Sequence, residues 1–276
     1  MTDVNVTRKR VSLAYAGAVE AESCCGSPAP KGEAAKLAGY DEVELRDLPA
    51  DAVVNSFGCG NPVAFAAIAE GQVVLDLGSG AGIDLLLAAK KVGPSGRVIG
   101  IDMTDEMIAR ARENVAAAGV DNVEIRKGII EELPVSDSSV DWVISNCVIN
   151  LSPEKDKVFA EIARVLKPGG RMSVSDIVAE ELPDWVQADE VLYNSCIGGA
   201  ISEADYTAGL SRAGLADVAV EERLPYDAVQ MEDLLVSEIA DTSAGGCCGS
   251  TTRDPADIAR AVEGKVWSAR VTARKP

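Results

Sequence analysis

The sequence of 276 residues contains no histidine, and aromatic residues make up only 4% of it. Since histidine is the commonest general base and a frequent metal ligand, any chemistry must rest on other side chains. No apolar run is long enough to span a membrane, and Met1–Arg10 lacks the apolar region of an export signal. We therefore expect a cytoplasmic protein with no membrane partner.

Basic residues are also scarce, with 26 Lys and Arg against 44 Asp and Glu, which gives a formal net charge of −18. Such an acidic surface repels phosphate backbones, so a nucleic-acid partner is disfavoured. Hydrophobic residues account for 47% of the chain, which is enough for a full core in one large domain or two modest ones.

Cysteine, by contrast, is plentiful. In a cytosolic chain these thiols are reduced at rest, which leaves them as core residues, ligands of soft ions or redox-active groups. The seven are Cys24, Cys25, Cys59, Cys147, Cys196, Cys247 and Cys248.

A glycine-rich turn follows the most apolar short run of the chain. Val73–Leu77 predicts a buried parallel strand, and Ile83–Val92 has the apolar spacing of a helix. Gly78, Gly80 and Gly82 between them allow a ligand to approach the backbone closely, beside the amides of the helix N-terminus. The stretch predicts a nucleotide or nucleoside pocket at the carboxyl end of the first strand of an open α/β sheet.

Strands alternate with helices over the following hundred residues, which predicts an α/β, Rossmann-like parallel sheet flanked by helices. We expect strands at Val73–Leu77, Arg97–Asp102, Val123–Arg126, Asp141–Ser145 and Arg171–Asp176, and helices at Ile83–Val92, Asp105–Ala118 and from Ser152 to about Leu166. The loop that begins Gly128-Ile129 then falls on the ligand-facing edge.

Outside this core the pattern is looser. We expect a loosely ordered arm in residues 1–30, an arm and linker to residue 54, the core over 55–180, and a smaller C-terminal region over 181–276. Further expected helices are Lys31–Leu37, Val63–Ala69, Asp184–Asn194 and one capped by Ser202, with a strand at Asp217–Leu224 and further strands within Ile258–Ala273.

The acidic residues around the glycine turn suggest which cofactor it holds. Asp102 lies 24 residues after Gly78, close to the spacing of a carboxylate that binds ribose hydroxyls. Asp76 precedes the glycines, where it can organise the loop and a bound amino-acid group. The Gly-x-Gly-x-Gly spacing favours S-adenosylmethionine over a dinucleotide, although a dehydrogenase remains an alternative.

Three cysteines stand near this predicted edge. Cys59 lies on a bent loop between Gly58 and Gly60, Cys147 directly follows a core strand, and Cys196 comes from the segment beyond the core. Thiols from three regions of the chain could therefore converge, and a thiolate-bound trivalent metalloid is a soft acceptor that needs no base. The alternative for each cysteine is a buried small apolar residue.

Several motifs closely resemble those of arsenite methyltransferases, a family within the class I methyltransferases, from about Asn55 to Ala200. They are Phe57–Pro62 (Phe-Gly-Cys-Gly-Asn-Pro), Leu75–Gly82, Gly100–Thr104, Ser145–Leu151 and Cys196–Ala200. The resemblance implies that Cys147 and Cys196 bind arsenic, and that Cys59 joins them or forms a disulfide. It assigns a fourth catalytic thiol to the Cys24–Cys25 pair, of which we favour Cys25.

The same resemblance implies S-adenosylmethionine as cofactor, arsenite or thiol-bound trivalent arsenic as substrate, and thioredoxin or glutathione as reductant of a protein disulfide. Two alternatives stay open: a class I methyltransferase with an organic acceptor, and a soft-metal thiol buffer. We expect the cofactor to contact Asp76, Gly78, Ser79, Gly80, Gly82, Asp102, Met103, Gly128, Ile129 and Asn146.

Overall fold

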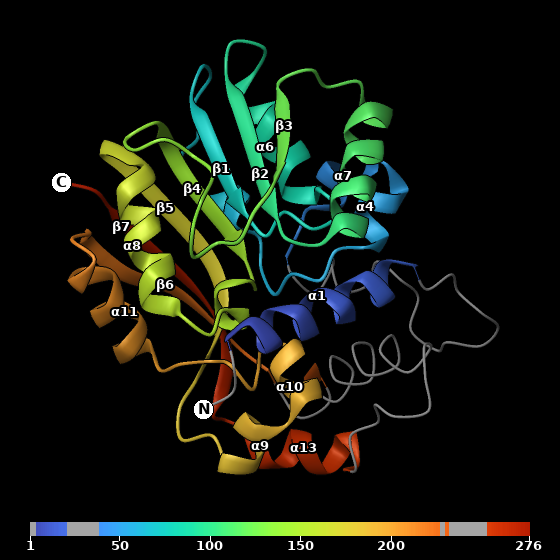
Figure 1. The fold of residues 1–276 in the computed structure, drawn as a ribbon, viewed down its shortest axis with the longest axis vertical. Coiled ribbons are helices and arrows are strands. Elements are labelled where there is room, and N and C mark those ends of the chain that lie inside the picture. Colours follow the sequence, from blue (N-terminus) through green and yellow to red (C-terminus); the bar gives the residue numbers. More distant parts are fainter. Residues whose placement is uncertain (1–3, 21–38, 227–229, 232–252) are drawn as a thin grey trace.

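The computed structural model describes residues 4–20, 39–226, 230–231 and 253–276, and its central feature is one seven-stranded sheet (Figure 1). The strand order is β3-β2-β1-β4-β5-β7-β6. The strands are β1 (Val73–Leu77), β2 (Arg97–Asp102), β3 (Val123–Lys127), β4 (Val140–Asn146), β5 (Leu166–Ala179), β6 (Ala216–Pro225) and β7 (Val266–Arg274).

Strands β1 to β5 run parallel, as the sequence predicts, but β7 pairs antiparallel with both β5 and β6. The expectation of a parallel sheet is thus wrong for this edge. Strand β7 lies between β5 and β6 in the sheet. Strands from residues 181–276 therefore extend the same sheet that the expected core over 55–180 forms. The Asp217–Leu224 strand and the strand character of the last segment are confirmed.

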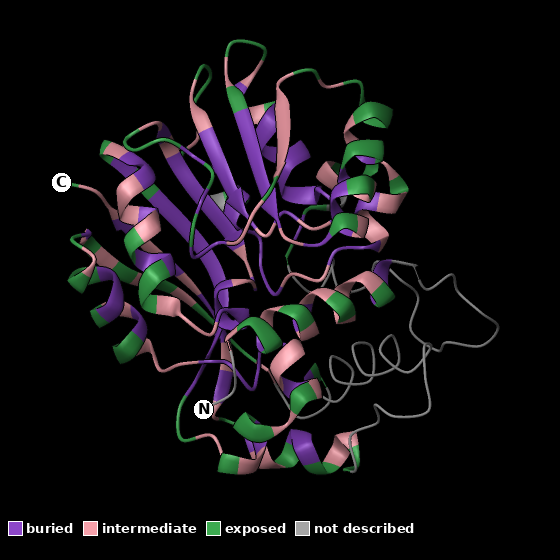
Figure 2. Ribbon diagram, in the orientation of Figure 1, coloured by how far each residue is buried: buried purple, intermediate pink, exposed green. Residues whose placement is uncertain are grey.

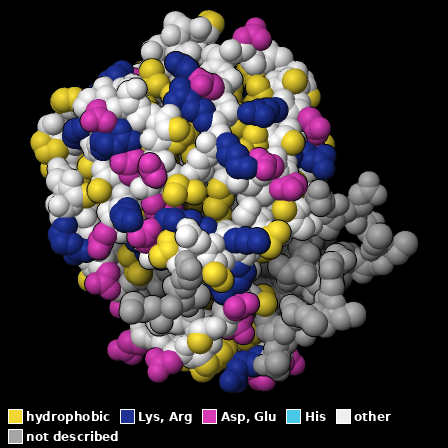
Figure 3. Space-filling model, viewed as in Figure 1, with side chains coloured by type: hydrophobic (Ala, Val, Ile, Leu, Met, Phe, Trp, Pro, Cys, Tyr) yellow, Lys and Arg dark blue, Asp and Glu magenta, His cyan; other side chains and the backbone are white. Residues whose placement is uncertain are grey.

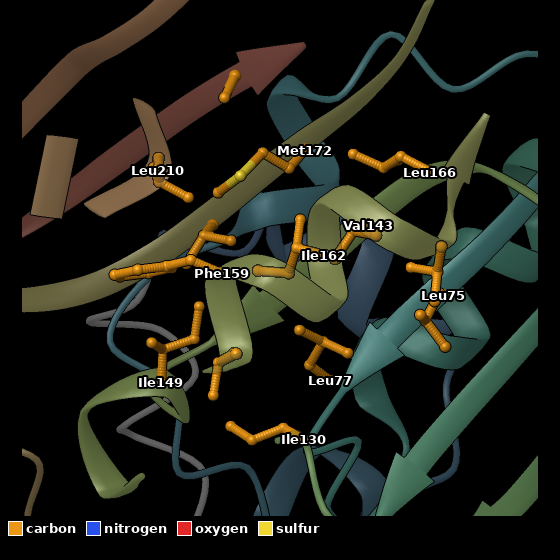
Figure 4. Close-up of a cluster of buried hydrophobic side chains, with 14 of the residues drawn as sticks. Leu75, Leu77, Ile130, Val143, Ile149, Phe159, Ile162, Leu166, Met172 and Leu210 are labelled. Carbon is orange, nitrogen blue, oxygen red and sulfur yellow. The ribbon is translucent and has the colours of Figure 1, made fainter. Parts of the chain in front are cut away.

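Alternate residues of the strands supply two separate cores. Leu75 faces the side covered by α8 (Lys155–Val165) and α11 (Glu203–Arg212), where Phe159 and Leu210 pack (Figure 4). Val74 faces the other side, which is covered by α4 (Ala50–Val54), α5 (Pro62–Phe65), α6 (Ile83–Val92) and α7 (Asp105–Ala118). Because both faces are covered, most residues of the central strands are buried and their sequences are mostly apolar (Figure 2).

The N-terminal segment differs from expectation. Residues 4–20, expected to be loosely ordered, form the helix α1 (Val4–Glu20), which lies across the molecule below the strands β1 and β2 in the view of Figure 1. Its buried residues Thr7, Val11, Ala18 and Val19 recur at helical spacing. Other apolar residues of the helix, Val6 and Leu13, are exposed, so the apolar pattern of this segment does not mark a single buried face.

Some other helices are shorter than expected. The Val63–Ala69 helix is α5 and ends at Phe65, and the Asp184–Asn194 helix is divided into α9 (Asp184–Ala188) and α10 (Glu190–Asn194). Asp189 causes the break because its carboxylate accepts hydrogen bonds from the first amides of α10. The remaining elements are α3 (Glu42–Arg46), the 3₁₀ turn η1 (Ile149–Leu151) and α13 (Pro255–Val262). The expected helix Lys31–Leu37 and the pairs Cys24–Cys25 and Cys247–Cys248 lie outside the described residues.

Among the described residues, no helix is both long enough and apolar enough to cross a membrane. The surface carries both signs of charge interspersed over the face seen in Figure 3, so the acidic surplus is not gathered there into one patch. A dispersed charge of this kind supports solubility and does not mark a binding site.

One buried carboxylate makes stability depend on pH. Asp176 on β5 is fully buried, and its oxygens accept hydrogen bonds from Asn150 (2.8 Å) and Tyr206 (3.3 Å). Burial raises the pKa of Asp176 to about 7. Since this exceeds the value of about 3.9 in an unfolded chain, the ionised form is disfavoured in the folded state, and the free energy of unfolding falls as the pH rises from 4 to 7.

The side chain of Asp176→Asn cannot ionise. We therefore expect its free energy of unfolding, relative to that of the wild type, to rise by on the order of 2 kcal/mol when the pH is raised from 5 to 8. Urea unfolding followed by circular dichroism at both pH values measures this difference. The control is Asp121→Asn at an exposed position. An equal difference from the wild type at the two pH values would contradict the assignment.

Candidate active site

A cavity lies at the carboxyl ends of β1 to β4, the edge at which open α/β sheets bind ligands. Of the ten residues expected to contact a cofactor, eight line it: Gly78, Ser79, Gly80, Asp102, Met103, Gly128, Ile129 and Asn146. The other two, Asp76 and Gly82, are buried and do not line the cavity.

The glycine loop after β1 has a backbone that other residues adopt with difficulty. Gly78, Gly80 and Gly82 have φ angles of +67°, +50° and +96°. A Cβ atom at Gly78 would also lie 2.4 Å from the side chain of Val148. The loop therefore needs glycine both for its turn and for close packing against the segment that follows β4.

Asp102, at the end of β2, joins this loop to the next one. One carboxylate oxygen accepts a hydrogen bond from the Gly80 amide (3.0 Å), and the other accepts one from the Thr104 amide (2.9 Å). Burial raises the pKa of Asp102, and these amides act in the opposite direction. Asp102 lines the cavity, at the position where a carboxylate after the second strand binds ribose hydroxyls in such sheets.

Two more carboxylates lie beneath the loop. Asp76 is 2% exposed, and one of its oxygens has no hydrogen-bond partner within the described structure. Burial, and then the charges of Asp84 and Asp102, raise the pKa of Asp76 well above its usual value. Burial likewise raises the pKa of Asp84 to about 6, although hydrogen bonds from Tyr40 and Asn146 oppose the shift.

This group of three acids fits a cationic ligand. Buried carboxylates without a positive partner are costly, and a positively charged ligand would offset their mutual repulsion. S-adenosylmethionine carries both a sulfonium and an ammonium group, and its ribose suits Asp102. The cavity residues therefore fit this cofactor, and the unpaired oxygens of Asp76 and Ser79 are consistent with a polar ligand there.

Helix α1 forms one wall of the cavity, which the sequence analysis missed. Arg8, Val11 and Tyr15 line it, and Arg8 forms ion pairs with Glu131 (3.3 Å) and Glu154 (2.7 Å). These contacts join the helix to the loops that follow β3 and η1. A run of residues 4–16 without glycine or proline was the available signal for such a helix.

The three cysteines expected to converge do so. Cys59 and Cys147 form a disulfide, with their Cα atoms 5.8 Å apart, and the Cys196 thiol donates a hydrogen bond to the Cys147 carbonyl (2.7 Å). All three are buried in one cluster with α13, and of the three only Cys147 lines the cavity. Within the described residues, no set of three or more His, Cys, Asp or Glu side chains is arranged to hold a metal ion, and two of the sulfurs are bonded to each other.

The backbone at two of these cysteines is unusual. Cys147 and Cys196 have φ angles of +56° and +64°, in the left-handed region that non-glycine residues rarely adopt. Such conformations cluster at functional sites, where the surrounding structure holds them in place. At Cys147 the amide donates a hydrogen bond to the Ser175 carbonyl (2.9 Å), which fixes the turn after β4.

Lys155 supplies a cation that the sequence analysis did not identify near the thiols. Burial lowers its pKa, whereas the nearby Asp176 and Cys196 act in the opposite direction. Its ammonium group also donates hydrogen bonds to the carbonyls of Asn150 (3.1 Å) and Ser152 (2.9 Å). Lys155 thus places a positive charge within electrostatic reach of the Cys196 sulfur.

The sheet order, the glycine loop after β1 and the acid after β2 define the class I fold of S-adenosylmethionine-dependent methyltransferases. A family model described as a methyltransferase domain matches residues 68–214.

The arsenite methyltransferase of Halobacterium salinarum is 47% identical over 79% of this chain and 59% of its own length. That of Aquipseudomonas alcaligenes is 38% identical over 75% of this chain and 60% of its own length. The crystal structure of an arsenic(III) S-adenosylmethionine methyltransferase from Chlamydomonas reinhardtii matches with a TM-score of 0.65 and 32% identity, covering 90% of this chain and 74% of that one. The chain belongs to the arsenite methyltransferase family. It spans about 60% of the length of the two curated relatives.

The acids beneath the loop make cofactor affinity depend on pH. Below about pH 6 Asp84 becomes protonated and loses the charge that attracts a cation. We expect S-adenosylmethionine to bind more weakly at pH 5.0 than at pH 7.5, by up to about tenfold for one group. Isothermal titration calorimetry at both pH values measures this change.

Asp84→Asn should bind the cofactor more weakly at pH 7.5 and lose most of the dependence on pH. S-adenosylhomocysteine, which lacks the sulfonium charge, is the control ligand and should show a smaller dependence in the wild type. Equal pH profiles for the wild type and Asp84→Asn would contradict the role of this carboxylate.

Proposed function

We propose that this protein transfers methyl groups from S-adenosylmethionine to trivalent arsenic held by its cysteine thiolates. The observation that carries the proposal is the disulfide between Cys59 and Cys147, next to the Cys196 thiol and at the wall of the cofactor cavity. A methyltransferase for an organic acceptor has no use for three converging sulfurs. A thiol buffer has no use for the cofactor cavity.

Sulfur is the appropriate ligand for this substrate because soft centres such as trivalent arsenic select thiolates. In the reduced protein, Cys147 and Cys196 would bind arsenic, and Cys59 lies close enough to Cys147 to join them. Deprotonation of the thiols accompanies binding, as for metal ions, and Lys155 assists it at Cys196.

The cavity would present the methyl group of the cofactor, an electrophile on a positively charged sulfur, to the arsenic at Cys147. Arsenic in the trivalent state already carries a lone pair, so no general base is needed, in keeping with a chain that lacks histidine. Alignment of the two centres by the cavity then supplies most of the rate enhancement.

The cysteines would also supply electrons. Gain of a methyl group raises arsenic formally from the trivalent to the pentavalent state, and two electrons are needed to restore it. Cys59 and Cys147 provide these two electrons when their thiols lose two protons and form the disulfide. A thiol reductant of the thioredoxin or glutathione type then resets the pair by exchange, in the reducing cytoplasm.

Cys25 would act as a fourth thiol in this cycle. It lies outside the described residues, so its part is proposed from the family resemblance alone.

The direct test is a reaction of the purified full chain with arsenite, S-adenosylmethionine and a thiol reductant, analysed by speciation of arsenic. We expect methylated arsenicals, and S-adenosylhomocysteine in equal molar amount to the methyl groups transferred. Cofactor binding without any methylated arsenic would overturn the proposal in favour of an organic acceptor.

Single cysteine substitutions separate binding of arsenic from supply of electrons. Cys196→Ser and Cys147→Ser should weaken arsenite binding at least about tenfold, or 1.4 kcal/mol, and leave cofactor affinity nearly unchanged. Cys59→Ser should retain two ligands and lose mainly turnover. Arsenite titration and cofactor calorimetry on the same samples measure both properties, and undiminished arsenite binding by Cys196→Ser would refute the ligand assignment.

A further inference from the structure

Side chains from the sheet hold both backbone groups of Cys59. Its amide donates a hydrogen bond to Oδ1 of Asn146 (3.0 Å), and its carbonyl accepts one from the hydroxyl of Ser268 (2.9 Å). The amide of Gly60 donates to the same Oδ1 (3.2 Å), and the carbonyl of Gly60 accepts from Nδ2 of Asn146 (2.6 Å). One side-chain amide on β4 thus binds two successive residues of the loop that carries a redox-active thiol.

Two buried groups fix the orientation of this amide. Nδ2 of Asn146 also lies within hydrogen-bond distance of the Tyr40 hydroxyl (2.8 Å) and of a carboxylate oxygen of Asp84 (3.2 Å). The Tyr40 hydroxyl donates to the other oxygen of Asp84 (2.9 Å). Since an ionised carboxylate only accepts hydrogen bonds, Asn146 must direct its NH₂ group toward Asp84 and its oxygen toward the loop.

The loop approaches the side chains of β4 and β5 too closely for a side chain at either residue that flanks Cys59. A Cβ atom at Gly58 would lie 2.2 Å from Nδ2 and 2.6 Å from Oδ1 of Asn146, and one at Gly60 would lie 2.6 Å from Cβ of Ser175. Real Cβ atoms do not approach other atoms so closely. Gly58 is therefore required by the contact with Asn146, and Gly60 by the contact with Ser175.

Asn146 directly precedes Cys147 in the chain. The end of β4 therefore positions Cys147 through the backbone and the Cys59 loop through the Asn146 side chain. The two cysteines are 88 residues apart in sequence, and reduction of the disulfide removes their covalent link. The hydrogen bonds of Asn146 do not depend on that link. We propose that Asn146 is a positioning residue that keeps the Cys59 thiol beside Cys147 in the reduced protein and so determines how readily the disulfide forms.

The physical quantity at issue is the effective concentration of one thiol at the other. For exchange with glutathione, the two protein thiols and one glutathione disulfide give the protein disulfide and two glutathione molecules, which conserves electrons and protons. The equilibrium constant of this exchange rises with the effective concentration, since a mobile loop must lose entropy before the bond can form and a held loop has lost it already. Loss of the Asn146 contacts should therefore shift the equilibrium toward the dithiol.

The role in electron supply to arsenic rests on the proposed function, but the exchange equilibrium does not. The purified full chain is equilibrated in glutathione buffers of graded ratio, quenched and alkylated, and the state of Cys59 and Cys147 is read by peptide mass spectrometry. We expect Asn146→Ala to lower the equilibrium constant for disulfide formation about tenfold or more, which corresponds to about 30 mV in potential. Gly58→Ala, which keeps the amide and displaces the loop, should produce a change in the same direction.

The matched control is Asn122→Ala, which removes another side-chain amide that binds two carbonyls, those of Ala89 and Gly93, far from the thiols. It should leave the equilibrium at the wild-type value. Unchanged equilibria in both Asn146→Ala and Gly58→Ala, with native circular dichroism, would overturn the proposal. So would an effect of Asn146→Ala confined to S-adenosylmethionine affinity, because Asn146 would then act on the cofactor alone.

The two proposals fail in different experiments. If the wild type forms no methylated arsenic but Asn146→Ala still shifts the exchange equilibrium, the positioning role stands and the proposed substrate is wrong. If arsenic is methylated and the variants exchange like the wild type, the substrate stands and the positioning role is wrong.

Discussion

Parallel strands end at the same edge of a sheet, and the chemistry of this protein depends on that constraint. The ends of β1, β2, β3 and β4 contribute a glycine loop, a carboxylate, a second loop and a cysteine to one cavity. These segments lie far apart in the chain, and hydrogen bonds between the loops, such as that from Gly80 to Asp102, maintain their relative positions. The cofactor surface and the thiol that faces it are consequently parts of one rigid edge.

The charge at this edge is as important as its shape. Asp76 and Asp84 are buried beneath the glycine loop, where their ionised forms are disfavoured and repel each other. A protein tolerates such groups when a ligand supplies the missing positive charge. The cofactor before methyl transfer carries that charge on sulfur, whereas the product does not. Under the proposed function, the same acids would bind S-adenosylmethionine more tightly than the S-adenosylhomocysteine that remains after transfer.

The sequence was most informative where one interaction type dominates. Strands such as β1 could be predicted because burial on both faces gives a mostly apolar run, and the glycine loop could be predicted because its backbone requires glycine. Helix α1 was missed because it covers a ligand cavity with few apolar residues, such as Val11, and with an ion pair of Arg8. The antiparallel position of β7 was missed because periodicity does not encode strand order.

The thiol site was predictable only in part, for a related reason. Motif resemblance indicated that Cys59, Cys147 and Cys196 act together, but it left the disulfide open. The contacts that hold Cys59, from Asn146 and Ser268, come from strands up to 209 residues away and have no local signature. Asn146 was expected to bind the cofactor because it ends β4 at the cavity, which it does line. Its side chain also forms hydrogen bonds with the Cys59 loop, and nothing in the sequence indicated these.

Cys147 belongs both to the cofactor cavity and to the disulfide, and this constrains the order in which reduction and arsenic binding can occur. Its side chain lines the cofactor cavity, and in the oxidised protein its sulfur is bonded to Cys59. A sulfur engaged in a disulfide cannot serve as a thiolate ligand, so a molecule in this state cannot hold arsenic at Cys147. Under the proposed function, reduction of this disulfide would have to precede binding of the next arsenic, and the redox state of Cys147 would control access of the metalloid to the methyl group.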